Sequence, residues 1–401
     1  MKRSEFLKTS AAAAAAALAG SACRNEAEAE SARNKVRSYK RLGKTSIRMS
    51  DISLGCGRLP SSSMVLRAVD RGINFLDTSP DYGSGSSEEY IGEAMPRLNR
   101  RKLTICSKFC RANFGGHLPL GAKKKDYIAA VEGSLRRMKT NYLDIVYVHS
   151  VGSRSRDFGD EKRRLLSDEM LSAAEYLKRA GKIKYLGASS HGPNNMEKLL
   201  LTAVESGHFD LIMPALNFMK FSRLQTVLTA AKKRRVGVVA MKTLAGAKAM
   251  RVRTGGGPFE PAALKWALGR PEVDGLVITI KNVYKLNLFL GASGKKFAEA
   301  DQKILDEYAR LYSREYCRTG CGDCQGSCPE GVPIADVLRY QMYFENYGME
   351  KDAMKMYSGL GGTNAGICAG CKDSACTRAC PYGLDVKGQL SRAHRDLSFS
   401  V

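Results

Sequence analysis

INFLDTSPDYG, residues Ile73–Gly83, is a short apolar run that stops at Asp77 and continues in polar residues. Similar apolar runs recur along the chain, and amphipathic helical patterns such as residues 167–180 and 194–206 separate them. The eight runs begin at Ile52, Ile73, Leu103, Leu143, Tyr185, Leu211, Val236 and Gly275. Near-continuously apolar strands that alternate with helices are typical of a parallel sheet covered on both faces.

Eight strand–helix units within about 275 residues match the size of a (β/α)8 TIM barrel. The sequence therefore predicts an α/β barrel over residues 38–312. An open doubly wound sheet is the alternative, but no GxGxxG motif follows the first strand, which disfavours a dinucleotide-binding fold of that type.

Barrel enzymes carry their chemistry at the carboxyl ends of the strands. Four polar residues stand at three consecutive strand ends here: Asp77, Tyr82, Lys108 and His149. Each alone has a structural interpretation, such as a turn cap or a solvated strand end. Together they have a chemical logic, because a lysine lowers the pKa of a nearby tyrosine, an aspartate fixes the lysine and a histidine orients a carbonyl oxygen. The set predicts a general acid for carbonyl reduction by hydride.

The segments YKRLGKTSIRMSDISLGCG, from Tyr39, and NFLDTSPDYGSGSSEEYIG, from Asn74, resemble the aldo-keto reductases. The resemblance extends to about Leu290 and implies a TIM barrel. It also implies a nicotinamide cofactor, NADP(H) or NAD(H), and a substrate that is an aldehyde, a ketone or the corresponding alcohol, with sugars included. In that family the counterparts of Asp77, Tyr82, Lys108 and His149 form the catalytic tetrad.

The resemblance further implies cofactor contacts at the strand ends. These are expected at Gly55, Asp77, Ser189, Ser190, Asn217, Lys242, Leu244, Gly246, Lys281, Asn282 and Lys285. Ser189-Ser190 departs from the usual Ser-Asn pair. Lys281 and Lys285 suit a 2′-phosphate as point charges, but they suit a solvated helix start equally well. The choice between NADP and NAD stays open.

Eight of the twelve cysteines stand in two runs near the C-terminus. The first run, C-x3-C-x2-C-x3-C-P, comprises Cys317, Cys321, Cys324 and Cys328. The second, C-x2-C-x4-C-x3-C-P, comprises Cys368, Cys371, Cys376 and Cys380. Both resemble the bacterial ferredoxin run, in which the fourth cysteine serves the other cluster. They predict two [4Fe–4S] clusters with crossed ligation, Cys380 joining the first three cysteines and Cys328 joining the second three.

Helical patterns between the two runs predict a small, mostly helical ferredoxin-like iron–sulfur domain over residues 313–401. Some aldo-keto reductases carry such an extension. Zinc is the alternative metal, because it also takes four thiolates. Disulfides within such short loops would add little stability, so metal ligation is the preferred interpretation.

The N-terminal residues MKRSEFLKTSAAAAAAALAGSAC, residues 1–23, have the composition of a targeting signal. Arg3 and the run Phe6-Leu7-Lys8 match a twin-arginine signal, although Ser4 replaces the second arginine. The sequence thus predicts export to the periplasm or cell envelope, with a cytoplasmic location as the alternative. A polar linker is expected over residues 24–37.

The formal net charge of +24 suits an acidic electron carrier or an anionic membrane surface. Nucleic acid is not expected as a partner, because no interleaving of aromatic and basic residues occurs. The sequence leaves the oligomeric state open.

Two hypotheses follow. In the first, the barrel transfers hydride between a nicotinamide and a carbonyl compound, while two clusters relay electrons to or from a partner. In the second, the cysteine-rich C-terminus is a structural metal module for dimerisation or docking on a conventional carbonyl reductase.

Overall fold

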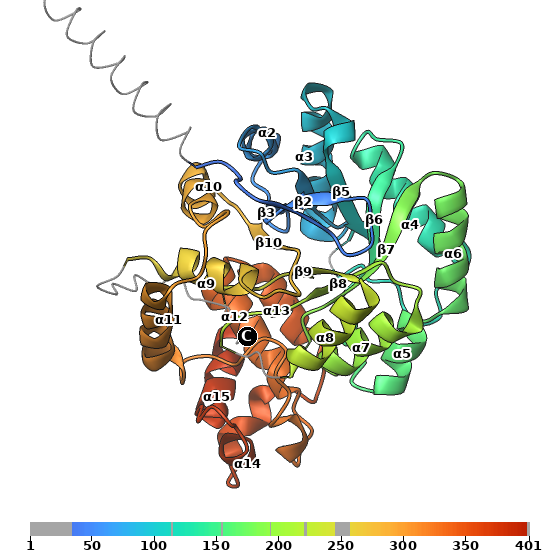
Figure 1. Cartoon of the computed structure of the whole chain (residues 1–401). Coiled ribbons are helices and arrows are strands. Elements are labelled where there is room, and N and C mark those ends of the chain that lie inside the picture. The colour runs from blue at the N-terminus through green and yellow to red at the C-terminus, as the bar shows by residue number, and fades with distance from the viewer. Residues whose placement is uncertain are drawn as a thin grey trace, which may run out of the picture.

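The computed structural model describes residues 34–398, apart from residues 114, 154, 193, 220–222 and 245–256 (Figure 1). The predicted signal of residues 1–23, linker residues 24–33 and the predicted cofactor contact Gly246 lie outside the described residues. Export therefore stays a prediction. Among the described residues, no helix combines the length and the apolar composition needed to cross a bilayer.

Eight parallel strands form a closed barrel in the order β10-β3-β4-β5-β6-β7-β8-β9. Their bounds are β3 (Ile52–Gly55), β4 (Phe75–Asp77), β5 (Thr104–Lys108), β6 (Leu143–Val148), β7 (Ile183–Ser190), β8 (Leu211–Pro214), β9 (Gly237–Ala240) and β10 (Gly275–Thr279). Every predicted apolar run supplies one of these strands, so the predicted barrel is confirmed. The alternative of an open sheet is wrong, because β10 pairs with β3 and closes the ring.

The register of the parallel strands aligns their carboxyl ends at one mouth of the barrel. Gly55 pairs with Asp77 across β3 and β4, and Asp77 pairs with Cys106 across β4 and β5. Lys108 at the end of β5 pairs with Tyr147 near the end of β6. Polar residues that follow these strands must therefore lie at the same mouth.

The opposite end of the barrel is covered by a hairpin of β1 (Tyr39–Arg41) and β2 (Arg48–Ser50). Leu42 and Met49 from this hairpin are fully buried among the inward-facing residues of the barrel. Gly237 on β9 makes room for Leu42, because a Cβ at that position would come within 2.6 Å of the leucine side chain. This end is packed shut, which leaves the carboxyl mouth for chemistry.

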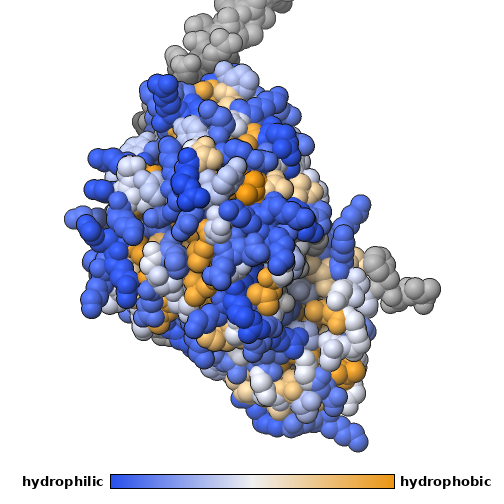
Figure 2. Space-filling view, turned by 90° about the vertical axis from the view of Figure 1, so that its right-hand side faces the viewer, coloured by the Kyte–Doolittle hydropathy of each residue, from blue (hydrophilic) through white to orange (hydrophobic). Residues whose placement is uncertain are grey.

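An outer layer of helices covers the barrel, and its apolar faces pack against the strands. These helices are α2 (Ser62–Asp70), α3 (Ser86–Ala94), α4 (Lys124–Arg137), α5 (Phe158–Leu165), α6 (Asp168–Arg179), α7 (Met196–Ser206), α8 (Leu224–Arg234), α9 (Phe259–Leu268) and α10 (Val283–Leu290). The face of the molecule in Figure 2 is dominated by hydrophilic side chains, and apolar ones are scattered over it.

The chain after the barrel forms further helices that lie beside the barrel's mouth in Figure 1, coloured orange to red. Their bounds are α11 (Glu299–Tyr312), α12 (Ile334–Tyr347), α13 (Glu350–Ser358), α14 (Ala375–Arg378) and α15 (Val386–Leu397). A second hydrophobic core around Ile334, Val337 and Leu390 joins α12 to α15, and several of the clustered cysteines belong to it. Helix α11 packs instead against α9, through Leu305 and Tyr308.

Candidate active site

The ends of three neighbouring strands bring the four predicted catalytic residues together. β4 ends at Asp77, β5 ends at Lys108, and His149 directly follows β6. Tyr82 begins the short helix η1 (Tyr82–Gly85) in the loop after β4. The ring centroids of Tyr82 and His149 lie 6.0 Å apart, and Nζ of Lys108 lies 5.2 Å from the Tyr82 centroid. These residues therefore form one constellation at the mouth.

Lys108 is held as a buried ammonium. Its Nζ donates to Oδ1 of Asp77 at 2.8 Å and to the carbonyl oxygen of Thr78 at 2.6 Å. The side chains of Lys108 and Asp77 are 2% and 6% exposed. Burial works to lower the pKa of Lys108, but the carboxylate of Asp77 outweighs it and the pKa is raised. A fixed positive charge therefore lies beneath Tyr82.

Two opposing effects set the pKa of Tyr82. Burial raises this pKa, and the charge of Lys108 opposes the rise without cancelling it. Lys108 thus lowers the pKa as predicted, but the net shift is upward because burial outweighs this effect, and the sequence gives no measure of how deeply the phenol is buried. Tyr82 is thus protonated at neutral pH, which is the state that a proton donor needs.

His149 is neutral at neutral pH. Burial lowers its pKa well below the usual value, and Asp81 only partly opposes this effect. Nδ1 of His149 lies 2.9 Å from Sγ of Cys110 and 3.7 Å from Oδ1 of Asp81. A neutral imidazole can donate a hydrogen bond to a substrate oxygen without competing as a proton source.

Arg164 of α5 holds the chain segment that carries His149. Its guanidinium donates to the carbonyl oxygen of His149 at 3.1 and 3.2 Å and to that of Ser150 at 3.1 Å. Glu161, one turn earlier, accepts from Arg164 at 2.9 Å, and both side chains are at least 95% buried. Glu161 also accepts from the backbone of Gly152 at 2.8 Å. This pair links α5 to the loop after β6.

Glu161→Ala is expected to destabilise the fold by about 3–5 kcal/mol, because it leaves the buried charge of Arg164 without its partner. The measurement is the free energy of unfolding in urea. The matched control is Asp160→Ala on the same helix, where the pair with Arg163 is solvated; its cost should stay below about 1 kcal/mol. Equal losses for the two variants would contradict the role given to Glu161.

The residues predicted to hold the nicotinamide end of the cofactor are buried at the same mouth. Ser189 and Ser190 end β7, and Asn217 follows β8. The hydroxyl of Ser189 accepts from the backbone nitrogen of Ser150 at 3.0 Å, while that of Ser190 donates to the carbonyl oxygen of Val151 at 2.6 Å. Both serines therefore also tie β7 to the loop after β6.

Other predicted cofactor contacts have structural partners of their own. Asn282 caps α10 by accepting from the backbone nitrogen of Lys285 at 2.9 Å, and Nζ of Lys285 pairs with Glu260 at 2.7 Å. Leu244 packs against the apolar cores. Gly55 lets β3 approach β10, since a Cβ there would come within 3.1 Å of the β10 backbone.

A group of cations gathers at the mouth near β3, β9 and β10. Lys242 and Arg58 lie 5.0 and 4.9 Å from the ring centroid of Tyr347 on α12. Burial, followed by the charge of Arg58, lowers the pKa of Lys281. Nη1 of Arg58 is buried and makes no hydrogen bond within the described part of the chain. An anion would accept a hydrogen bond from this atom and reduce the repulsion between the neighbouring cations. Arg58 was not predicted from the sequence.

The eight clustered cysteines fall into two groups of four in space. The first group comprises Cys317, Cys321, Cys324 and Cys380, and the second comprises Cys328, Cys368, Cys371 and Cys376. Burial and then the other three thiols of the first group raise the pKa of Cys317 to about 12. In the same way, burial and the other thiols of the second group raise the pKa of Cys368 to about 11. All four cysteines of the second group also line one small cavity.

The sulfur atoms of these two groups are spread out. Four thiolates on one zinc ion would lie about 3.8 Å from one another, given Zn–S bonds of about 2.3 Å. Among the described residues, three or more metal-ligating atoms converge within 4.8 Å only at another site, around His149. Neither cysteine group therefore places three sulfur atoms within 4.8 Å of one another.

The loop of the first cysteine group packs directly on the barrel mouth. Arg339 of α12 donates to the carbonyl oxygens of His191 and Gly192 at 2.9 and 2.8 Å. A Cβ on Gly192 would come within 2.5 Å of Cα of Gly320, which lies between Cys317 and Cys321. Because His191 directly follows Ser190, this cysteine loop borders the predicted nicotinamide end of the cofactor site.

Comparisons with known proteins agree with this geometry. Residues 60–256 match the model of the aldo/keto reductase family. The chain is 32% identical over 161 residues to an uncharacterised oxidoreductase, YqkF, of Bacillus subtilis, covering 39% of this chain and 49% of that protein. It is 31% identical over 175 residues to an L-glyceraldehyde 3-phosphate reductase of Escherichia coli, covering 40% and 48%. The matches thus span about half the length of these two relatives.

An L-galactose dehydrogenase of Arabidopsis thaliana is 27% identical over 245 residues, covering 58% of this chain and 70% of that protein. Among solved structures, the holo form of an aldo-keto reductase from Bacillus halodurans superposes with a TM-score of 0.53 at 21% identity. That match covers 67% of this chain and 96% of the other, and it supports the barrel fold.

Proposed function

We propose, from the aldo/keto reductase domain at residues 60–256, that this chain is an oxidoreductase that interconverts carbonyl compounds and alcohols with a nicotinamide cofactor. The observation that carries the proposal is the buried ion pair of Lys108 with Asp77 beneath Tyr82, at 2.8 Å. Burying two charges costs free energy, so packing alone does not explain an ion pair at this mouth.

The side chains at this mouth divide the work of carbonyl reduction. Tyr82 donates a proton to the substrate oxygen. Lys108 stabilises the phenolate that then forms, and Asp77 keeps Lys108 in position. Neutral His149 orients the substrate oxygen by a hydrogen bond. The cofactor, when bound, supplies the hydride that the carbonyl carbon accepts.

The chain offers a fitting site for such a cofactor. Ser189, Ser190 and Asn217 would hold its nicotinamide end. Lys242, Lys281 and Arg58 would hold its phosphates, and the buried Nη1 of Arg58 that makes no hydrogen bond within the described residues supports an anion there.

We propose small sugars and related hydroxy-aldehydes as the substrate class. Two of the relatives are named for L-galactose and L-glyceraldehyde 3-phosphate. A mouth lined by charged and hydroxyl groups suits a substrate with several hydroxyls.

We further propose that the two cysteine groups hold two [4Fe–4S] clusters with the crossed ligation described above. The observation that supports this is that each group takes one cysteine from the other run. Such clusters supply one-electron transfer when bound. The packing of Gly320 on Gly192 supports electron exchange with the cofactor site rather than a purely structural role, and the positive surface suits an acidic carrier.

The experiment for the catalytic proposal is a turnover assay on anaerobically purified protein. NADPH and NADH are each offered with aldoses, small aldehydes and ketones, and nicotinamide absorbance is followed. We expect substrate-dependent oxidation of one nicotinamide at a rate on the order of 1 s⁻¹ or more for the preferred substrate. Tight binding of nicotinamide without oxidation by any carbonyl compound, and without reduction by any of the matching alcohols, would refute the proposal.

A further inference from the structure

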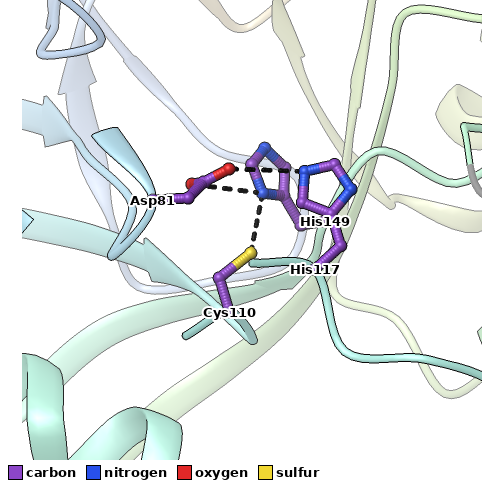
Figure 3. Close-up of side chains that lie close together, drawn as sticks. All are labelled: Asp81, Cys110, His117 and His149. Atoms are coloured by element: carbon purple, nitrogen blue, oxygen red, sulfur yellow. Dashed lines mark hydrogen bonds and ion pairs between the residues drawn. The ribbon is translucent and has the colours of Figure 1, made fainter. Parts of the chain in front are cut away.

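We propose that Asp81, Cys110, His117 and His149 bind one divalent ion of the zinc type at the barrel mouth. Each residue offers one ligand atom, and the four atoms lie within 4.8 Å of one another. Figure 3 shows the four side chains pointing toward a common centre; Cys110 and His117 belong to one loop, and Asp81 and His149 come from two others. This site is distinct from both cysteine groups of the C-terminal module.

The distances are close to those of a tetrahedral site. Oδ1 of Asp81 lies 3.7 Å from Nδ1 of His149, and Oδ2 lies 3.4 Å from Nε2 of His117. Sγ of Cys110 lies 2.9 Å from Nδ1 of His149. Ligand bonds of about 2.0–2.3 Å to zinc would place neighbouring ligand atoms about 3.3–3.8 Å apart. Small side-chain movements are therefore enough to close the site around an ion.

The donor set selects the class of ion. One thiolate, two imidazoles and one carboxylate suit Zn²⁺, whereas Mg²⁺ and Ca²⁺ require oxygen ligands. One thiolate and one carboxylate also neutralise the charge of a divalent ion. The site is half-buried to buried, which makes this neutrality necessary.

The backbone of the loop after β5 brings two of the ligands together. Cys110 and His117 pair as an isolated antiparallel bridge, and the backbone nitrogen of Arg111 donates to the carbonyl oxygen of Gly116 at 2.7 Å. The loop therefore turns back and returns His117 to the mouth. Asp81 arrives from the loop after β4, and His149 arrives from the end of β6.

Outer contacts hold the ligands in orientation, as metal sites require. Ser79 donates to Oδ1 of Asp81. Nδ1 of His117, the ring nitrogen away from the centre, lies 3.3 Å from the hydroxyl of Ser153, which itself donates to the carbonyl oxygen of Ser150 at 2.6 Å. These contacts leave Nε2 of His117 aimed at the shared centre.

The ion would act on His149 rather than on the substrate. Four protein ligands complete a tetrahedral site and leave no open position. Coordination through Nδ1 fixes the proton of His149 on Nε2, and a ring with this tautomer donates a hydrogen bond. This consequence rests on the proposed function, in which His149 orients the substrate oxygen; the existence of the site does not.

The test is zinc stoichiometry on the full chain with its C-terminal module loaded. Protein is equilibrated with zinc chloride, desalted, and analysed for zinc and iron by mass spectrometry. Wild type and the control His208→Gln, an exposed histidine elsewhere, should retain one more zinc per chain than His117→Gln and Asp81→Asn, at equal iron. Equal zinc in all four proteins would overturn the proposal, whether or not the chain shows turnover.

A second measurement does not depend on the variants. Zinc K-edge absorption of wild type should show one sulfur and three nitrogen or oxygen neighbours per ion. A purely four-sulfur environment would place all zinc in the cysteine groups and would overturn the site. Thermal melting of each variant checks that its fold is intact. Both variants should fold, because His117 is partly exposed and Asp81→Asn keeps the side-chain volume.

Discussion

Tyr82→Phe is expected to lower kcat for carbonyl reduction by about 10²–10⁴-fold, because it removes the group that donates a proton to the substrate oxygen. The phenyl ring keeps the packing against His149, whose centroid lies 6.0 Å away. The fold should therefore survive, and the nicotinamide should still bind. The measurement is steady-state kinetics with the preferred substrate, together with nicotinamide titration of each protein.

The matched control is Tyr185→Phe. The hydroxyl of Tyr185 bonds with Ser46 in the β1–β2 hairpin, at the closed end of the barrel, 3.0 Å from its backbone nitrogen. Its loss should leave kcat within about twofold, since the group is remote from the mouth. A Tyr82→Phe variant that retained kcat would remove Tyr82 from the mechanism and would require another proton donor.

Cys380→Ser and Cys324→Ser are expected to lose the same cluster, although the two residues come from different cysteine runs. Cys328→Ser and Cys376→Ser should both lose the other one. Each variant should retain about half of the iron and sulfide of wild type, which is expected to be about eight irons for two [4Fe–4S] clusters. The measurement is iron and sulfide analysis after anaerobic purification, with paramagnetic resonance of the reduced protein to identify the surviving cluster.

The pairing of phenotypes is the decisive result. If Cys380→Ser instead matched Cys376→Ser, each run would ligate its own cluster and the crossed assignment would be wrong. Two zinc ions per chain in place of iron would exclude electron relay and favour the structural module. Cys106→Ser, in the interior of the barrel and outside both groups, is the control that should keep all iron.

The barrel could be predicted from sequence because eight apolar runs carry a strong and repeated signal. Polar residues such as Asp77 and His149 stand where those runs end, and parallel strands place such ends at one mouth. The hairpin of β1 and β2 was not foreseen, because each strand has three residues and little apolar pattern. The hairpin stabilises the fold through Leu42 and Met49, which fill one end of the barrel. Their partners on the strands are remote in sequence, so the sequence does not reveal these contacts.

The candidate site was only partly predictable. The raised pKa of Tyr82 depends on burial, which is a property of the folded neighbourhood. Asp81 and His117 were not predicted as site residues, because their partners are remote in sequence. His117 reaches the site only through the backbone bridge that it forms with Cys110. The sequence offered one signal, the small number of histidines: the chain has five. In the structure three of them, His117, His149 and His191, lie at this mouth.

The position of the C-terminal helices could not be derived from the cysteine spacing. That spacing predicts which thiols share a cluster, but it does not predict where the module docks. The module docks through the hydrogen bond from Arg339 to the carbonyl oxygen of Gly192 and through the packing of Gly192 on Gly320. Glycine has no side chain, so such a contact leaves no pattern in the sequence.

Hydride transfer at this mouth can be tested by following the hydride itself. The protein is incubated with a nicotinamide deuterated at the transferable position and with an aldehyde substrate, and the alcohol product is analysed by mass spectrometry. We expect one deuterium on the carbinol carbon of each product molecule. An alcohol without deuterium, formed at the same rate, would show that the carbon receives its hydrogen from elsewhere and would exclude hydride transfer from the nicotinamide.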